Sequence, residues 1–305
     1  MVSVDAALAA VSLDRIRGHI RSLEGVRHPV TAPAALVKAE GYIAATLGDL
    51  GYAVNLEPFQ DSGCTFNNVV ATKMGTTSPL RRVLVVAHFD TVADSPGADD
   101  NASGVAVLLE MATLLKNVRF EKSILFVGVN LEENADESIS GTGTRGSRAL
   151  ARLAKEQGWD IEGVVVLESV AFAGNTVLQT TPAGLPLEVP KEGDFIAVIG
   201  NEASPRLVEG FRRAIESYRV DLPCVPLVVP GNGELIPDTR RSDHAPFWDH
   251  GFPAVMLTDT TNFRNRHYHQ PTDTLDTLNI PFAGNVCKAA AGLVADLALP
   301  CAVTG

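Results

Sequence analysis

Three near-continuous apolar runs, separated by helical segments, constrain the fold of this chain most. They are residues 83–87 (VLVVA), 123–130 (SILFVGVN) and 163–168 (GVVVLE). Strands buried on both faces have this composition, because helices cover each side of a parallel sheet. Helical patterns follow the first two runs and end near Leu115 and Gln157. The alternation predicts an α/β fold with a mixed, mostly parallel sheet flanked by helices on both faces.

The rest of the chain extends this pattern in both directions. Ser12 and Pro33 occupy positions typical of helix starts, and Gly51 is a plausible helix end. We expect two edge-like strands at 52–59 and 67–73, buried strands at 195–200 and 253–259, helices at 204–218 and 277–299, and surface loops at 170–193 and 229–243.

Composition favours one large globular domain that covers residues 1–305. The chain is 46% hydrophobic and 20% charged, which is enough apolar material for a large core. Its net charge of -11 and pI of about 5.1 argue against nucleic acid or an anionic membrane as a partner, because both repel an acidic surface. Composition does not indicate the oligomeric state.

Cysteine usage and the amino terminus bear on the compartment. Cys64, Cys224, Cys287 and Cys301 are scattered without metal-binding spacing, which predicts free thiols in a reducing environment. The first residues, MVSVDAALAAVSLDRIRG, lack the basic start and apolar core of a secretion signal. We therefore expect a cytoplasmic protein.

The stretch AHFDTVADSPGADDNASG, residues 87–104, has the chemistry of a metal site. His88 ends the first buried run, which places an imidazole at the carboxyl end of a strand. Asp90 can accept a hydrogen bond from the ring nitrogen that does not face a metal. Asp100 precedes a helix, where a carboxylate is either a cap or a ligand.

Further acids and imidazoles follow the other predicted strands. Ligands of α/β proteins bind beyond the carboxyl ends of the strands, which makes these positions informative. Glu132 and Glu133 follow the second run; one of the pair can bind a metal while the other reaches a water beside it. Glu168 ends the third run, and His269 lies in a loop after the last one, with His267 as an alternative.

Taken together, the motifs AHFDT, PGADDNASG, the Glu132–Glu133 pair, VLES, SDHAPF and YHQPTDTLD resemble the zinc-dependent aminopeptidases of metallopeptidase clan MH, relatives of bacterial leucyl aminopeptidases. The resemblance extends over residues ~20 to 300. It implies a single phosphorylase/hydrolase-like catalytic domain, in agreement with the α/β pattern.

The resemblance also implies a set of site residues. It makes Glu132 the general base and assigns two zinc ions per chain to five ligands: His88, Asp100, Glu133, Glu168 and His269. Together with Glu132 we predict Asp90, the partner of His88, as a catalytic residue. Asp100 would bridge the ions, with His88 and Glu168 completing one site and Glu133 and His269 the other. Many relatives carry Asp where this chain has Glu168.

Four residues are candidates for substrate binding. Asp243 and His244, in SDHAPF, could line a pocket, while Ser242 and Asp243 could instead cap a short helix. Arg264 is close in sequence to His269 and could bind a substrate carboxylate; a solvated loop arginine is the alternative for both Arg264 and Arg266. Tyr268 directly precedes His269 and is the fourth candidate.

The implied function is aminopeptidase action on a peptide or small amide. A glutaminyl cyclase is an alternative, with a single zinc at the counterparts of Asp100, Glu133 and His269, although His88 argues against it. A carboxypeptidase or dipeptidase of the same clan is another. The relatives with an inserted dimerisation domain need more chain than lies between Glu168 and His269, and a receptor-like member would be expected to lack ligands.

Overall fold

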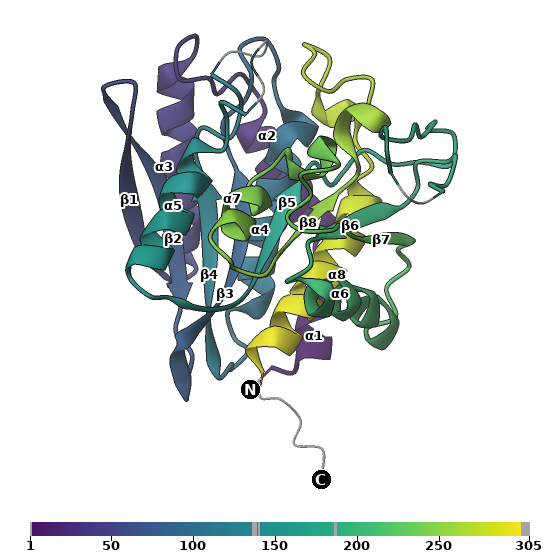
Figure 1. Ribbon diagram of the computed structural model, residues 1–305. Coiled ribbons are helices and arrows are strands. Elements are labelled where there is room, and N and C mark those ends of the chain that lie inside the picture. Colours follow the sequence, from purple (N-terminus) through teal and green to yellow (C-terminus); the bar gives the residue numbers. More distant parts are fainter. Residues whose placement is uncertain (1, 136–138, 140, 186–187, 300–305) are drawn as a thin grey trace.

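The computed structural model describes residues 2–135, 139, 141–185 and 188–299. Within these residues one eight-stranded sheet organises the fold (Figure 1). Its spatial order is β1-β2-β4-β3-β5-β8-β6-β7. The strands are β1 (Ala53–Asp61), β2 (Cys64–Lys73), β3 (Ser78–His88), β4 (Lys122–Val129), β5 (Asp160–Glu168), β6 (Ile196–Gly200), β7 (Cys224–Val228) and β8 (Ala254–Thr258).

The sheet is mixed, as the sequence predicts. The central strands β4, β3, β5 and β8 pair in parallel, and β6 pairs in parallel with β7. The β1–β2 hairpin joins β4 in antiparallel fashion, and β6 runs antiparallel to β8. The parallel centre places the carboxyl ends of β3 and β5 side by side, which is where His88 and Glu168 lie.

Eight α-helices surround the sheet in the described part of the chain. Ser12 caps the second helix by accepting a hydrogen bond from the Arg15 amide, and Pro33 opens the third, as the sequence predicts. The helices are α1 (Val4–Leu8), α2 (Leu13–Leu23), α3 (Pro33–Asp49), α4 (Gly104–Leu115), α5 (Arg145–Glu156), α6 (Pro205–Ser217), α7 (His244–Asp249) and α8 (Ile280–Ala298).

Two apolar cores lie on opposite faces of the sheet. Successive side chains of a strand point to opposite faces, so Val83 and Val85 pack with α2, α4 and α8, whereas Leu84 and Val86 pack under α5 and α7. Figure 1 shows these helices on either side of the strands. The α/β fold with helices on both faces is therefore confirmed.

Some local expectations differ from the structure. Strand β7 was not predicted, because it is a short edge strand in which Pro226 interrupts the apolar pattern. Helix α7 does begin after Asp243, but that carboxylate makes no capping hydrogen bond. Cys64, Cys224 and Cys287 are free thiols, and Cys301 lies outside the described residues. No helix in the described ranges is long and apolar enough to cross a bilayer.

Candidate metal centre

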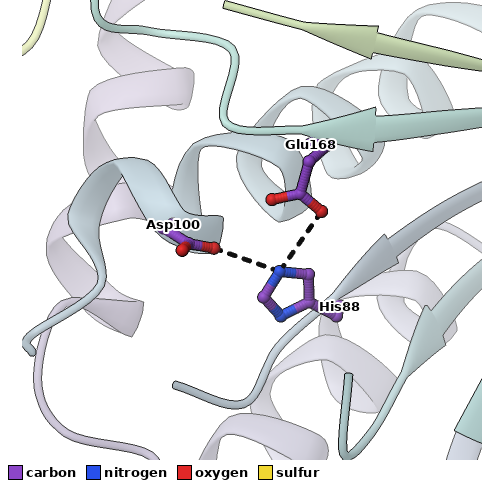
Figure 2. Close-up of side chains that lie close together, drawn as sticks. All are labelled: His88, Asp100 and Glu168. Atoms are coloured by element: carbon purple, nitrogen blue, oxygen red, sulfur yellow. Dashed lines mark ion pairs between the residues drawn. The ribbon is translucent and has the colours of Figure 1, made fainter. Parts of the chain in front are cut away.

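A first group of ligand-capable side chains is built on two adjacent strands. His88 ends β3 and Glu168 ends β5, and the parallel register that pairs Val86 with Val166 brings both residues level. The His88 Nε2 atom lies 3.5 Å from Glu168 Oε2 and 3.1 Å from Asp100 Oδ1 (Figure 2). We call His88, Asp100 and Glu168 the strand triad.

A second group shares Asp100 and adds two loop residues. Asp100 lies in the kinked segment Ala98–Ser103 between β3 and α4, and its own φ of -106° and ψ of 91° are not helical. Its Oδ2 atom is 3.2 Å from His269 Nε2, and Glu133 Oε2 is 3.3 Å from the same nitrogen. We call Asp100, Glu133 and His269 the loop triad. The five ligands implied by the sequence resemblance are thus brought together around one shared carboxylate.

The chemistry of these atoms fits a bound cation. In each triad the ligand atoms lie within 4.8 Å of one another. His88 Nε2, Asp100 Oδ1 and Glu133 Oε1 are buried and make no hydrogen bond to a described residue. Burial and the neighbouring Asp100 raise the pKa of Glu133 to about 7. Imidazole and carboxylate are zinc ligands, and a divalent ion would relieve the cost of burying these acids together.

Asp90 contacts residues of both triads: His88 of the strand triad and the backbone of Glu133 in the loop triad. Its Oδ1 atom lies 3.5 Å from His88 Nδ1, the ring nitrogen that faces away from the other ligands. Its two carboxylate oxygens also accept the backbone N–H groups of Glu132, at 3.0 Å, and Glu133, at 3.1 Å. Burial opposes ionisation of Asp90, but His88 and these amides hold its pKa below the ordinary value. The carboxylate therefore orients the His88 ring and fixes the backbone of the Glu132–Glu133 pair.

Glu132 faces the centre without joining either triad. Its Oε2 atom is 4.0 Å from His88 Nε2, and the residue lines two cavities that meet at the triads. Burial raises the pKa of Glu132 well above its ordinary value; His88 opposes the shift, while Glu168 adds to it. A buried carboxyl with a raised pKa beside a metal site is suited to proton transfer.

Three residues that support the site were not identified from the sequence. The Asp273 carboxylate accepts the amides of Asp99, at 2.9 Å, and Asp100, at 3.2 Å. Ser242 donates its hydroxyl to Glu168 Oε2 at 2.6 Å. Both lie within motifs already singled out, PTD and SDH, so their polar character near ligands was the available signal.

Arg27 is the third such residue and no motif marks it. Its guanidinium is buried and donates to the carbonyls of Phe89 at 2.7 Å, Pro96 at 2.9 Å and Gly97 at 3.0 Å. It also donates to the carbonyls of Leu23 and Gly25. It therefore ties the segment after α2 to the loop between His88 and Asp100.

The four candidates for substrate binding lie in different places. Tyr268 is at the centre: its ring stacks on that of His269, with centroids 3.8 Å apart, and it lines both cavities. Asp243 is buried nearby, and its burial raises the pKa to about 7 although His88 lowers it. Its substrate contact stays a prediction.

The structure does not bring His244 or Arg264 to the metal centre. His244 is buried, with Nε2 on the Thr239 carbonyl at 2.7 Å and its ring edge-on to Trp248. Arg264 is buried as well and donates to Gln179 and to the Gly193 and Phe195 carbonyls, so it is not a solvated loop arginine. Both side chains satisfy backbone groups, because their loops turn them inward.

Two cavities open at the triads. One is a cleft of about 800 Å³ that contains Glu132, Glu133 and His269. The other begins at Asp100, Glu132 and Glu168 and continues into an apolar pocket under β6, β7 and β8. The apolar walls of that pocket include Leu185, Phe195, Ile199, Val225, Leu227, Met256 and Phe263. A substrate can thus place an apolar side chain on one side of the metal centre and extended chain on the other.

Sequence comparisons place this geometry among zinc peptidases. Residues 68–294 match the sequence profile of peptidase family M28. The protein YfbL of Escherichia coli is 31% identical over 88% of this chain and 83% of its own length. Leucine aminopeptidase 1 of Coccidioides posadasii is 27% identical over 76% of this chain, and a probable zinc metalloprotease of Leptosphaeria maculans is 27% identical over 68%. The chain spans 55% and 50% of these two fungal proteins, about half their length.

Solved structures share the fold at lower identity. LapB from Legionella pneumophila has a TM-score of 0.77 and 19% identity, covering 97% of this chain and 75% of that one. The glutaminyl cyclase of Porphyromonas gingivalis has a TM-score of 0.72 and 18% identity, covering 93% and 98%. The same fold therefore occurs in proteins with different names.

Proposed function

Since this chain belongs to peptidase family M28, a family of zinc metallopeptidases, we propose that it is an aminopeptidase with two zinc ions. The observation that carries the proposal is the pair of triads that share Asp100, with Glu132 beside them in neither triad. A single-ion site would not need both His88 and His269. A structural zinc would not need an acid at the mouth of a cavity.

The strand triad would hold one ion and the loop triad the other. Zinc bound in these positions would supply Lewis acidity for the scissile carbonyl and would lower the pKa of a water. Glu132 takes a proton from the attacking water and passes it to the amine nitrogen of the leaving peptide. Asp90 keeps the His88 ring in position and, through its two backbone contacts, keeps Glu132 facing the cavity.

Charge and shape favour a free N-terminal residue with an apolar side chain. Glu132, Glu168 and Asp100 stand at the mouth of the apolar pocket, where an ammonium group is favoured over a carboxylate. Val225 and Met256 are among the apolar residues that line the pocket beyond them. Arg264, which could have recognised a C-terminal carboxylate, is turned inward, and this removes one argument for a carboxypeptidase.

A panel of arylamides tests the proposal. The metal-free protein, reconstituted with zinc, should cleave leucyl and phenylalanyl arylamides and should have little action on their N-acetylated forms or on aspartyl arylamide. Faster cleavage of acetylated substrates would overturn the aminopeptidase assignment.

Calorimetric titration of the metal-free protein with zinc tests the stoichiometry. Two ions per chain are expected. One ion per chain, together with cyclisation of an N-terminal glutamine, would instead support a glutaminyl cyclase.

A further inference from the structure

We propose that Arg241 is a positioning residue that aims the hydroxyl proton of Tyr268 into the metal centre, so that the phenol can donate to the oxygen of the substrate's reacting carbonyl. The inference rests on the proposed function, because it assigns a role within that same reaction. The sequence drew attention to Arg264 and Arg266, and the structure places a different arginine at the site.

The contact between Arg241 and Tyr268 is direct. Arg241 Nη2 donates to Tyr268 Oη at 3.1 Å, and Nη1 donates to Asn262 Oδ1 at 3.0 Å. The guanidinium carbon lies 5.9 Å from the centre of the Tyr268 ring. Both residues line the cleft and the apolar pocket, so they stand where the two cavities meet.

The hydrogen bond from Arg241 restricts the direction of the Tyr268 O–H bond. The ring of Tyr268 is already fixed by stacking on His269 at an interplanar angle of 16°. What stays variable is the direction of the O–H bond, because a hydroxyl rotates to suit its partners. A guanidinium has no acceptor, so the phenol oxygen must accept from it and direct its own proton elsewhere. No described residue accepts that proton.

The contact with Arg241 also polarises the phenol. Because the charged guanidinium donates to the phenol oxygen at 3.1 Å, it makes the hydroxyl group a stronger hydrogen-bond donor. A fixed donor that faces a developing negative charge stabilises the transition state without reorganisation.

The neighbouring arginine provides a matched control. Arg240 donates to both oxygens of Asp249 at 2.8 Å and to the Asn232 carbonyl, whereas the hydrogen bond to Tyr268 comes from Arg241. Arg241, by contrast, donates hydrogen bonds to the neutral Asn262 and Tyr268, and its Nη1 atom forms a longer ion pair of 3.6 Å with Asp238 Oδ1. Removal of either arginine deletes one positive charge next to the same loop, but only Arg241→Met releases the phenol.

The test combines a double-mutant cycle with a binding ratio. Arg241→Met, Tyr268→Phe, the double variant and Arg240→Met are compared for kcat and KM on leucyl arylamide. Each is also compared for the affinity of a tetrahedral phosphonic-acid analogue of leucine relative to leucine itself. Zinc content is measured in every variant, so that a lost metal is recognised.

Tyr268→Phe should lower kcat by roughly 10²-fold, as expected for one lost oxyanion donor. Arg241→Met should lower it roughly tenfold, the worth of one charge-assisted hydrogen bond, with KM little changed. In the Tyr268→Phe background Arg241→Met should have no further effect, and Arg241→Lys should restore part of the rate. The affinity for the phosphonic acid relative to leucine should fall by a similar factor as kcat in each variant. Arg240→Met should keep the wild-type kcat, KM and affinity ratio.

Independent, multiplying effects of the two substitutions would overturn the role of Arg241, as would equal losses in Arg240→Met and Arg241→Met. A wild-type protein that does not cleave the arylamide would speak against the aminopeptidase instead. The binding ratio tests Arg241 in that case too, since it requires no turnover.

Discussion

The strand triad and the loop triad use the same ligand types, but the chain holds them in different ways. His88 and Glu168 are the last residues of two paired strands, and the His88 side chain is 1% exposed. Glu133 and His269 lie on loops; His269 has a positive φ of 58°, and its side chain is 20% exposed. The sheet sets the first geometry, and hydrogen bonds between loops set the second. We therefore expect the strand triad to bind its ion more tightly.

Glu132→Gln is expected to have the largest effect on kcat. It tests whether Glu132 acts as a base without belonging to either triad. Because Gln keeps the shape but cannot accept the proton, kcat should fall by roughly 10²–10⁴. Zinc content should stay unchanged, because Glu132 belongs to neither triad. Glu133→Gln is the matched control and should lose the ion of the loop triad. Equal zinc loss in both variants would show that the pair is assigned the wrong way round.

Ligand substitution compares the triads directly. His269→Ala should leave one ion per chain, held by the strand triad, and this ion should resist a mild chelator. His88→Ala should weaken the tighter site and leave only a readily removed ion. Zinc analysis during graded chelation measures both, and the expected loss of affinity at the altered triad is more than about 10²-fold, beyond that for supporting residues. If His269→Ala loses both ions first, the order of the triads is reversed.

Substitution of the supporting residues should also lower zinc affinity, but by less than substitution of a triad residue. Asp90→Asn removes the charge beside His88 and weakens both backbone contacts, so zinc affinity should fall by roughly 10–100-fold at the strand triad. Ser242→Ala deletes one hydrogen bond to Glu168 and should fall at the lower end of that range. Calorimetric titration of each metal-free variant provides the comparison, with Ser22→Ala as a control, because Ser22 is exposed and its hydroxyl donates to the Gly18 carbonyl within its own helix.

The smallest expected effect is a pH dependence of stability that zinc removes. Glu133 and Asp243 each have a pKa raised to about 7 by burial, so the folded protein binds protons that the unfolded chain releases near pH 4. Stability from this source is complete below the unfolded pKa and is lost as pH rises through 7. The Tm of the metal-free protein should therefore fall by a few degrees between pH 5 and 8. A flat profile without zinc would contradict the buried, mutually repelling acids.

The contrast between the triads also explains what sequence patterns could predict. Apolar runs identify buried strands, and a polar residue that ends such a run must reach the edge of the sheet, so His88 and Glu168 follow from local pattern alone. Loop residues have no such rule. Proximity in sequence placed Arg264 beside His269, yet its loop turns it toward the Phe195 carbonyl. Arg241, which does reach Tyr268, comes from a different loop.

One edge of the sheet, the strand β7, was not predicted from the same patterns, for a related reason. The strand β7 is half exposed and contains a proline, so neither period nor composition marks it.

Asp99 lies next to Asp100 in the chain but accepts hydrogen bonds from the Ala171 amide and the Asn265 side chain, away from the triads. Long-range packing thus gives the two adjacent aspartates different partners, which residue type alone does not predict.

The buried guanidinium of Arg27 has a consequence for where this protein can be shortened. The family profile begins at residue 68, which leaves Arg27 and helices α1–α3 outside the matched region. A fragment trimmed to residues 68–294 would lose the donor to the Phe89, Pro96 and Gly97 carbonyls, each of which lies between His88 and Asp100 in the chain. The smallest unit that keeps this loop in place therefore starts well before the region that the family profile matches.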